Sequence, residues 1–115
     1  MTSDATEAFF AELAERGSEP LLGAVQGKLR FDLRSGKRTE HWRVAVKRGA
    51  VSVSRGDGAA DAVVMADREM FSKLVTGEAN ATAAILRGTV IVTGATELLV
   101  RFQRIFPAPP RELAN

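Results

Sequence analysis

The chain has 115 residues, a mass of 12.4 kDa and a formal net charge of +2 at pH 7. This length fits one domain, which can bury a hydrophobic core without metal ions or disulfides. The absence of cysteine excludes disulfide frameworks, zinc–thiolate sites, iron–sulfur clusters and thiol nucleophiles, and a single histidine, His41, leaves few acid–base groups for catalysis.

The first predicted element is a helix over residues 5–16. Asp4 and Glu7 have the spacing of a capping box, and Phe9 and Phe10 open a run of apolar residues at helical spacing that ends at a glycine. We expect these two phenylalanines to belong to the core rather than to contact a ligand.

Strict alternation of apolar and polar residues then predicts strands over residues 28–34, 41–47 and 50–54, separated by turns that contain glycine. Three strands so close in the chain should form an antiparallel meander, with Trp42 on its inward face. Basic residues collect on the outer face of this meander: Lys28, Arg30, Arg34, Arg43 and Lys47.

After a glycine-rich loop, residues 61–66 form a nearly continuous apolar run, which predicts a strand buried on both sides. Asp67 and Asn80 are placed to cap two helices, each of which ends at a glycine. A β-branched strand follows over residues 89–93, and a last helix runs over residues 96–105 before a proline stops it.

The predicted order is therefore α-β-β-β-β-α-α-β-α. It indicates an α+β fold in which a five-stranded, mostly antiparallel sheet carries helices packed on one face. We expect one domain over residues 1–106 and a short C-terminal tail over residues 107–115. No secretion signal or spanning segment is visible in the sequence, and we expect a cytoplasmic protein.

The basic outer face has two interpretations. Residues 28–55 hold nine basic residues against two acidic ones, which suits transient contact with an anionic membrane, but a solvated sheet face balanced by acidic helices explains them equally. The aromatic residues of this segment, Phe31 and Trp42, fall on the apolar side of the alternation, where they cannot stack on bases. We therefore expect no nucleic acid partner.

No catalytic or metal-binding signature is present: there is no nucleophile elbow, no phosphate-binding loop and no zinc-protease motif. Apolar side chains that could point at one volume are abundant instead. They either fill the core or leave an apolar cavity for a guest. The candidate ligand-binding residues are Trp42, Met65, Met70, Phe71, Leu74, Ile85, Leu86, Leu98, Leu99, Phe102 and Phe106.

The second half of the chain resembles the sterol carrier protein 2 family of nonspecific lipid carriers. The shared pattern is Leu74-x-x-Gly77, a short helix containing alanine, then Gly88-x-aliphatic-x-aliphatic-x-Gly94 and a closing helix. The strand that begins at Gly27, the Trp42-x-Val-x-Val strand and the strand and helix over residues 61–71 follow in the family's order. The resemblance covers about residues 6–106.

This resemblance implies five strands with flanking helices and an apolar tunnel for sterols, fatty acids, acyl-CoA or phospholipids. It implies no cofactor and no reaction. An isoprenoid is a further candidate ligand. The chain lacks the peroxisomal C-terminal tripeptide of animal members, and its bias toward arginine (12 Arg and 4 Lys) is typical of a free-standing bacterial member. The leading hypothesis is a non-catalytic carrier of an apolar ligand in an internal tunnel. The alternative is an interaction or scaffold module, dimeric or not, that supports a lipid-pathway enzyme.

Overall fold

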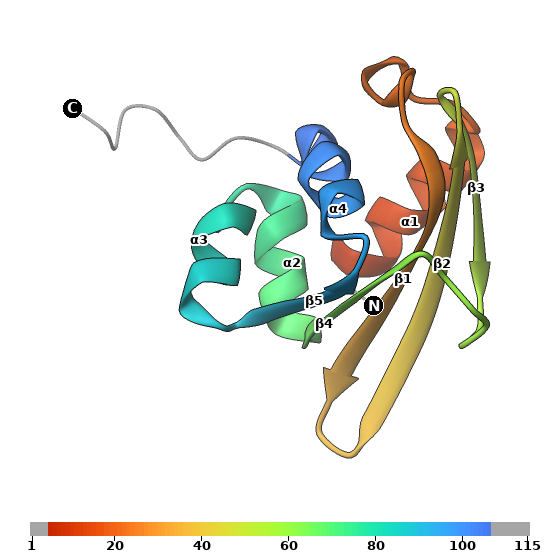
Figure 1. The fold of residues 1–115 in the computed structure, drawn as a ribbon. Coiled ribbons are helices and arrows are strands. Elements are labelled where there is room, and N and C mark those ends of the chain that lie inside the picture. The colour runs from red at the N-terminus through yellow and green to blue at the C-terminus, as the bar shows by residue number, and fades with distance from the viewer. Residues whose placement is uncertain (1–4, 107–115) are drawn as a thin grey trace.

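The structure, a computed structural model, describes residues 5–106 (Figure 1). Its helices and strands follow one another in the predicted order, which confirms the α+β fold, and two short 3-10 helices are added. In chain order the elements are α1 (Ala5–Arg16), η1 (Pro20–Leu22), β1 (Gln26–Ser35), β2 (Arg38–Lys47), β3 (Ala50–Arg55), β4 (Ala62–Asp67), α2 (Arg68–Thr76), α3 (Ala81–Arg87), β5 (Val90–Gly94), α4 (Thr96–Phe102) and η2 (Gln103–Ile105).

Two predictions fall outside the described residues: Asp4 as a helix cap and the tail over residues 107–115. The predicted closing helix over residues 96–105 is divided into α4 and η2, because its last turn tightens to 3-10 geometry.

The five strands form one sheet in the order β3-β2-β1-β4-β5. β1, β2 and β3 make the predicted antiparallel meander, β4 pairs with β1 in parallel, and β5 pairs antiparallel with β4. Two-residue turns join the meander. Gly36 has a φ of +65° at the first turn, while Arg48 and Gly49 have φ values of +51° and +88° at the second. Positive φ values at these positions match the right-handed twist of the strands on either side.

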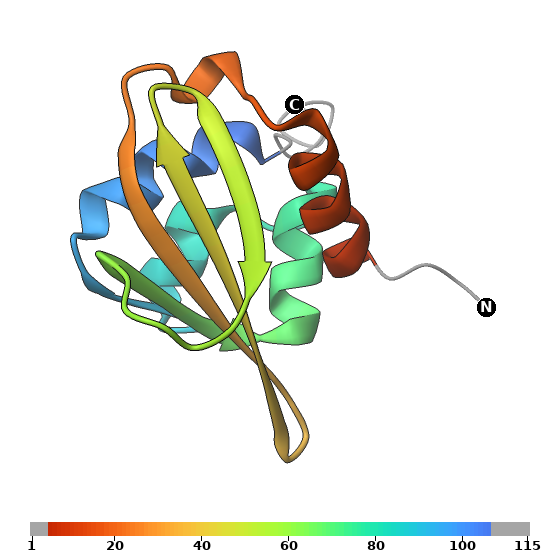
Figure 2. The same ribbon diagram turned by 90° about the vertical axis from the view of Figure 1, so that its right-hand side faces the viewer.

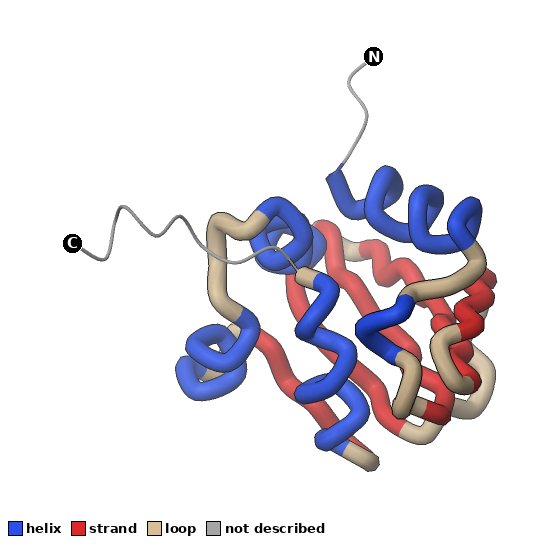
Figure 3. Tube along the Cα trace, turned by 90° about the horizontal axis from the view of Figure 1, so that it is seen from above, coloured by secondary structure: helices blue, strands red, loops and turns tan. Residues whose placement is uncertain are grey.

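All four α-helices lie on one face of the sheet, which curves around them (Figures 1 and 3). The opposite face carries no helix among residues 5–106, and we call it the helix-free face. The connection from β3 to β4, residues 56–61, crosses this face in front of β1 and β2 (Figure 2). The Arg30 guanidinium, which points outward from β1, donates hydrogen bonds from Nη1 to the backbone oxygens of Asp57 and Gly58 in this connection.

Gly94 holds the junction between β5 and α4 close to the start of β4. Its φ is +87°, and a Cβ at this position would overlap the backbone oxygen of Asp61. The Ala95 amide donates to that same oxygen at 2.9 Å. Glycine is therefore required here by both its backbone conformation and the lack of space.

The prediction that residues 61–66 are buried on both sides is wrong. Ala62, Val64 and Ala66 point into the core, while Met65, exposed to 40%, points to the helix-free face. The strand is apolar throughout because its outward residues pair with β5, where Met65 faces Ile91, and not because a second helix layer covers them.

Candidate functional site

All seven aromatic residues of the chain, six phenylalanines and one tryptophan, meet between the sheet and the helices. Phe10 is central to this cluster: its ring stacks on Trp42 with 4.4 Å between centroids and on Phe71 with 5.4 Å. Phe31 links Phe71, at 5.3 Å, to Phe102, at 5.5 Å. We call this cluster the ring layer; it consists of Phe9, Phe10, Phe31, Trp42, Phe71, Phe102 and Phe106.

The centre of the ring layer is filled. Phe10, Phe31, Phe71 and Phe102 each have a relative exposure of 0%, so their rings touch protein atoms on all sides and border no void that a water molecule could enter. An apolar guest could therefore occupy this layer only by displacing side chains.

The margin of the ring layer toward α1 and η2 is less closed. Phe9 and Phe106 are partly buried, and their ring centroids lie 5.6 Å apart. Met70 and Ile85 are also partly buried against the core on the same side of the sheet. These side chains lose the fewest contacts if they move, because solvent already reaches them.

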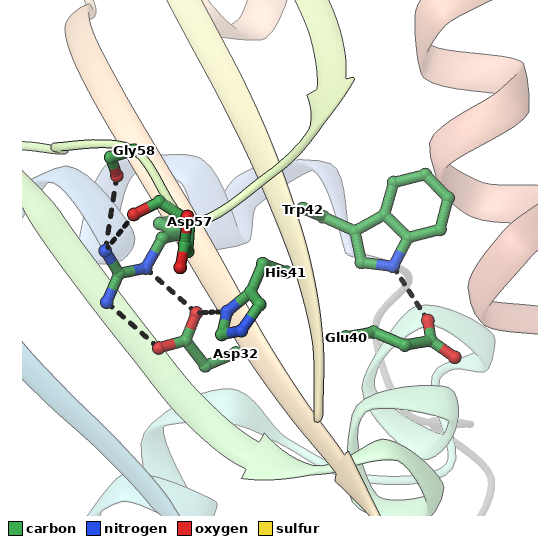
Figure 4. Close-up of polar contacts among 7 residues, drawn as sticks. Asp32, Glu40, His41, Trp42, Asp57 and Gly58 are labelled. Carbon is green, nitrogen blue, oxygen red and sulfur yellow. Dashed lines mark hydrogen bonds and ion pairs between the residues drawn. The ribbon is translucent and has the colours of Figure 1, made fainter. Parts of the chain in front are cut away.

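The opposite margin, at Trp42, is closed by polar groups. The Arg55 guanidinium lies 4.1 Å from the centre of the indole ring, on which Phe10 also stacks. The indole nitrogen donates to Glu40 at 3.0 Å (Figure 4). The second Glu40 oxygen accepts from Arg68 Nε at 2.8 Å. This network ties β2 to α2 and leaves the Phe9–Phe106 margin as the more open side.

The structure brings nine of the eleven predicted ligand-binding residues to the core. Six of them are buried: Trp42, Phe71, Leu74, Leu98, Leu99 and Phe102. Three are partly buried and pack against the core: Met70, Ile85 and Phe106.

The remaining two candidates, Met65 and Leu86, do not point at this volume, contrary to expectation. Met65 lies on the helix-free face, because side chains alternate along β4 and its neighbours Val64 and Ala66 point into the core. Leu86 is 82% exposed, because α3 turns the face that carries Ala81 and Ala84 toward the core and leaves Leu86 on the outward face. A helix this short has room for one apolar stripe, and Ile85 belongs to it.

Sequence reasoning named no ligand role for Phe9, Phe10 and Phe31, although the three rings form almost half of the ring layer. Their spacing assigned Phe9 and Phe10 to the core, and the alternation of β1 placed Phe31 on its apolar side. The signal that could have grouped them is composition: in a chain without tyrosine, every aromatic side chain is free to pack in an apolar cluster.

The helix-free face holds a separate polar cluster. Asp32, buried to 92%, accepts hydrogen bonds from Arg30 Nε at 2.9 Å and Nη2 at 3.1 Å and lies 2.8 Å from His41 Nδ1 (Figure 4). Burial alone would raise the pKa of Asp32, but the hydrogen bonds from Arg30 and His41 outweigh it and hold that pKa below its usual range. The bond to Asp32 in turn raises the pKa of Arg30.

Among residues 5–106, no group of three or more histidine, aspartate or glutamate side chains is placed to hold a metal ion. Over the same residues, no helix is long and apolar enough to cross a membrane.

The sequence and fold were compared with those of known proteins. The sequence model of the SCP-2 sterol transfer family matches residues 7–107. The chain belongs to this family. No curated protein sequence matches it.

Solved structures share the fold of this family member. Sterol carrier protein 2 from Aedes aegypti, solved in complex with palmitate, is 21% identical with a TM-score of 0.72, and the match covers 96% of this chain and 100% of that one. Domain 2 of a sterol carrier protein from Helicoverpa armigera is 24% identical with a TM-score of 0.67, covering 86% of this chain and 83% of that one. The sec-alkylsulfatase Pisa1 of Pseudomonas sp. is 19% identical with a TM-score of 0.71, covering 96% of this chain but 17% of the sulfatase.

Proposed function

We propose that this protein is a non-catalytic carrier that binds one apolar chain in the ring layer, between the sheet and the helices α2 and α4. The observation that carries the proposal is the concentration of all seven aromatic side chains in this one layer. Membership of the SCP-2 sterol transfer family and the palmitate complex of the Aedes aegypti protein support it. The proposal needs no cofactor and assigns no catalytic residue.

The ligand class is a fatty acid, acyl-CoA, phospholipid, sterol or isoprenoid, whose chain enters at the Phe9–Phe106 margin. Burial contributes about 0.8 kcal/mol for each methylene group, so a chain of palmitate length has a driving force on the order of 10 kcal/mol before the costs of association. Displacing two partly buried rings costs about 2 kcal/mol each by the same measure. A long chain can therefore displace the margin and leave the centre of the ring layer as its wall.

The ligand-binding residues we propose are the nine that pack in or against the core, together with Phe9. Met65 and Leu86 are not part of this set, since one lies on the helix-free face and the other is 82% exposed. The cytoplasmic location and the possibility of an oligomer stay predictions.

Native mass spectrometry before and after incubation with palmitate tests the proposal. Phe106→Gln places an amide at the partly exposed margin and should weaken palmitate binding about tenfold, whereas Leu86→Gln and Met65→Gln should leave it unchanged. Margin variants are preferable to Phe71→Gln or Phe102→Gln, because a buried amide without partners destabilises the fold itself.

Two outcomes would contradict the proposal. Weaker binding in the Met65 or Leu86 variant, with Phe106→Gln unaffected, would move the ligand out of the ring layer. A protein that stays bare with palmitate, acyl-CoA and phospholipid would favour the scaffold module, and its mass in analytical ultracentrifugation would then decide whether it dimerises.

A further inference from the structure

The helix-free face holds a groove that the ring layer does not use. It has a volume of about 450 Å³ and runs over the start of β1, the end of β2 and the start of β3, beside Asp61 of the crossing connection. A smaller hollow of about 170 Å³ adjoins it and shares Lys28, Ala45 and Ser52 with it. The floor is low because small side chains form it: Ala45, Ala50 and Ser52. Its volume suits a small ligand.

The sheet register concentrates positive charge around this floor. Ala45 of β2 pairs with Lys28 of β1 on one side and with Ser52 of β3 on the other. Arg43 and Lys47 stand two residues away along β2, so their side chains leave from the same face as Ala45. Diagonal neighbours of this kind lie about 7–8 Å apart, within reach of long side chains. Three cations and a serine hydroxyl can therefore meet over one alanine.

The five basic residues of this face fall into two groups. Arg30 is bound to Asp32 at 2.9 Å, and Arg34 lies 3.6 Å from Asp67. Lys28, Arg43 and Lys47 have no carboxylate partner within the described residues 5–106. The basic residues predicted for membrane contact are thus not equivalent, and the unpaired ones are those that line the groove and its adjoining hollow.

Arg43 is the clearest case of a cation without a counter-charge. It pairs with Arg30 across the β1–β2 ladder, so two guanidinium groups leave the sheet side by side. Of these two arginines, only Arg30 is paired with Asp32. The Arg43 guanidinium is confined against the crossing connection, where a Cβ on Gly58 would lie 2.9 Å from Arg43 Nη1. Like charges opposite one another destabilise a sheet, and an anion bound between them reverses that effect.

We infer that this groove binds a phosphate group, held by Lys28, Arg43 and Lys47 with hydroxyl donors from Ser52 and Ser54. Arginine offers a planar fork of donors to phosphate oxygens, and lysine offers a point charge. Asp61, the carboxylate at the rim, accepts a hydrogen bond from the Lys28 backbone amide at 2.8 Å, so one of its oxygens is already bound by the sheet. No aromatic side chain lies on this face to stack a base, because all seven belong to the ring layer. The phosphate is that of a soluble ligand or of a lipid headgroup.

Titrations followed by amide NMR test this inference with three probes: inorganic phosphate, pyrophosphate, and vesicles of phosphatidylglycerol against vesicles of phosphatidylcholine. Pyrophosphate should shift the amides of Ala45 and Ser52, and Arg43→Gln should weaken its binding about fivefold, as expected for one exposed ion pair at the upper end of the usual range. The double variant K28Q/K47Q should weaken binding about 25-fold, since it removes two such ion pairs. The control K37Q/R38Q removes the same charge from the exposed β1–β2 turn and should change nothing.

The arms of the experiment separate the two sources of phosphate. Shifts with pyrophosphate but no retention on phosphatidylglycerol vesicles indicate a soluble ligand, and vesicle retention that K28Q/K47Q removes indicates a headgroup. The inference is overturned if no probe shifts these amides, or if the control variant weakens binding as much as K28Q/K47Q. Palmitate uptake from solution should be equal in all of these variants, so failure of the groove and failure of the ring layer give different results.

Discussion

Phe71→Ala tests whether the centre of the ring layer is as filled as its burial indicates. Phe71 has a relative exposure of 0%, and its centroid lies 5.3 Å from Phe31, 5.4 Å from Phe10 and 6.0 Å from both Phe9 and Phe106. Truncating a buried phenylalanine costs about 3–5 kcal/mol, and four ring contacts favour the upper half of that range. Since a domain has about 5–15 kcal/mol of stability in total, the variant should fold but lose roughly 15 °C in Tm or more.

Urea unfolding followed by circular dichroism measures this loss, with Leu22→Ala as a control that empties an equally buried site outside the ring layer. Palmitate should then raise the urea midpoint of Phe71→Ala more than that of Leu22→Ala, because only the first cavity extends the proposed binding volume. If Phe71→Ala does not fold, Phe71→Leu takes its place in the experiment. A loss below about 1 kcal/mol for Phe71→Ala would refute the reasoning, since a ring in contact on all sides cannot be removed so cheaply.

Two further predictions concern the backbone and the charged cluster. Gly94→Ala should lower the free energy of unfolding by about 2 kcal/mol or more, because the residue has a φ of +87° and the added Cβ would overlap the backbone of Asp61. Gly88→Ala should lower it by only about 1 kcal/mol, because this residue has a similar φ of +80° but open space around it. Equal losses in urea unfolding would contradict the steric argument. The lowered pKa of Asp32 in the folded state stabilises the protein at pH values above the unfolded-state value of about 3.9, and this contribution is lost as the pH falls through the folded-state pKa. Asp32→Asn should therefore flatten the acid side of the stability profile, and an unchanged slope would show that Asp32 does not couple to folding.

Local rules in the sequence were sufficient for the order of elements. Alternation in β1 and β2 places Phe31 and Trp42 on the opposite face from their charged neighbours along each strand. The two residues pair across the ladder, so both rings lie on one face. Gly77 and Gly88 end α2 and α3 with φ values of +83° and +80°, as a helix C-cap favours. Each of these signals acts within a few residues, which is why sequence reasoning can detect it.

The candidate site was harder to predict because it depends on which face each apolar side chain takes. In β4 every residue from Ala62 to Ala66 is apolar, so the pattern alone does not say that Val64 points inward and Met65 outward. In α3 both Ile85 and Leu86 are apolar, and only the packing of Ala84 against the core decides between them. Such choices are made by tertiary contacts that carry no local signal.

The two proposed sites lie on opposite faces of one sheet, and this separation constrains what the protein can recognise. A chain in the ring layer lies on the helix side of the sheet, next to Phe31. The phosphate groove lies on the helix-free face, over Ala45, and the β1–β2 ladder separates the two. One small lipid therefore does not reach both with its tail and its headgroup. Affinity for the carried molecule should then follow chain length. A chain of about eight carbons contributes roughly 6 kcal/mol, which is less than the combined cost of displacing the margin, about 4 kcal/mol, and of association, about 4 kcal/mol or more. The groove can act only on a second molecule, and its charge can attract a phosphate surface without selecting what the ring layer carries.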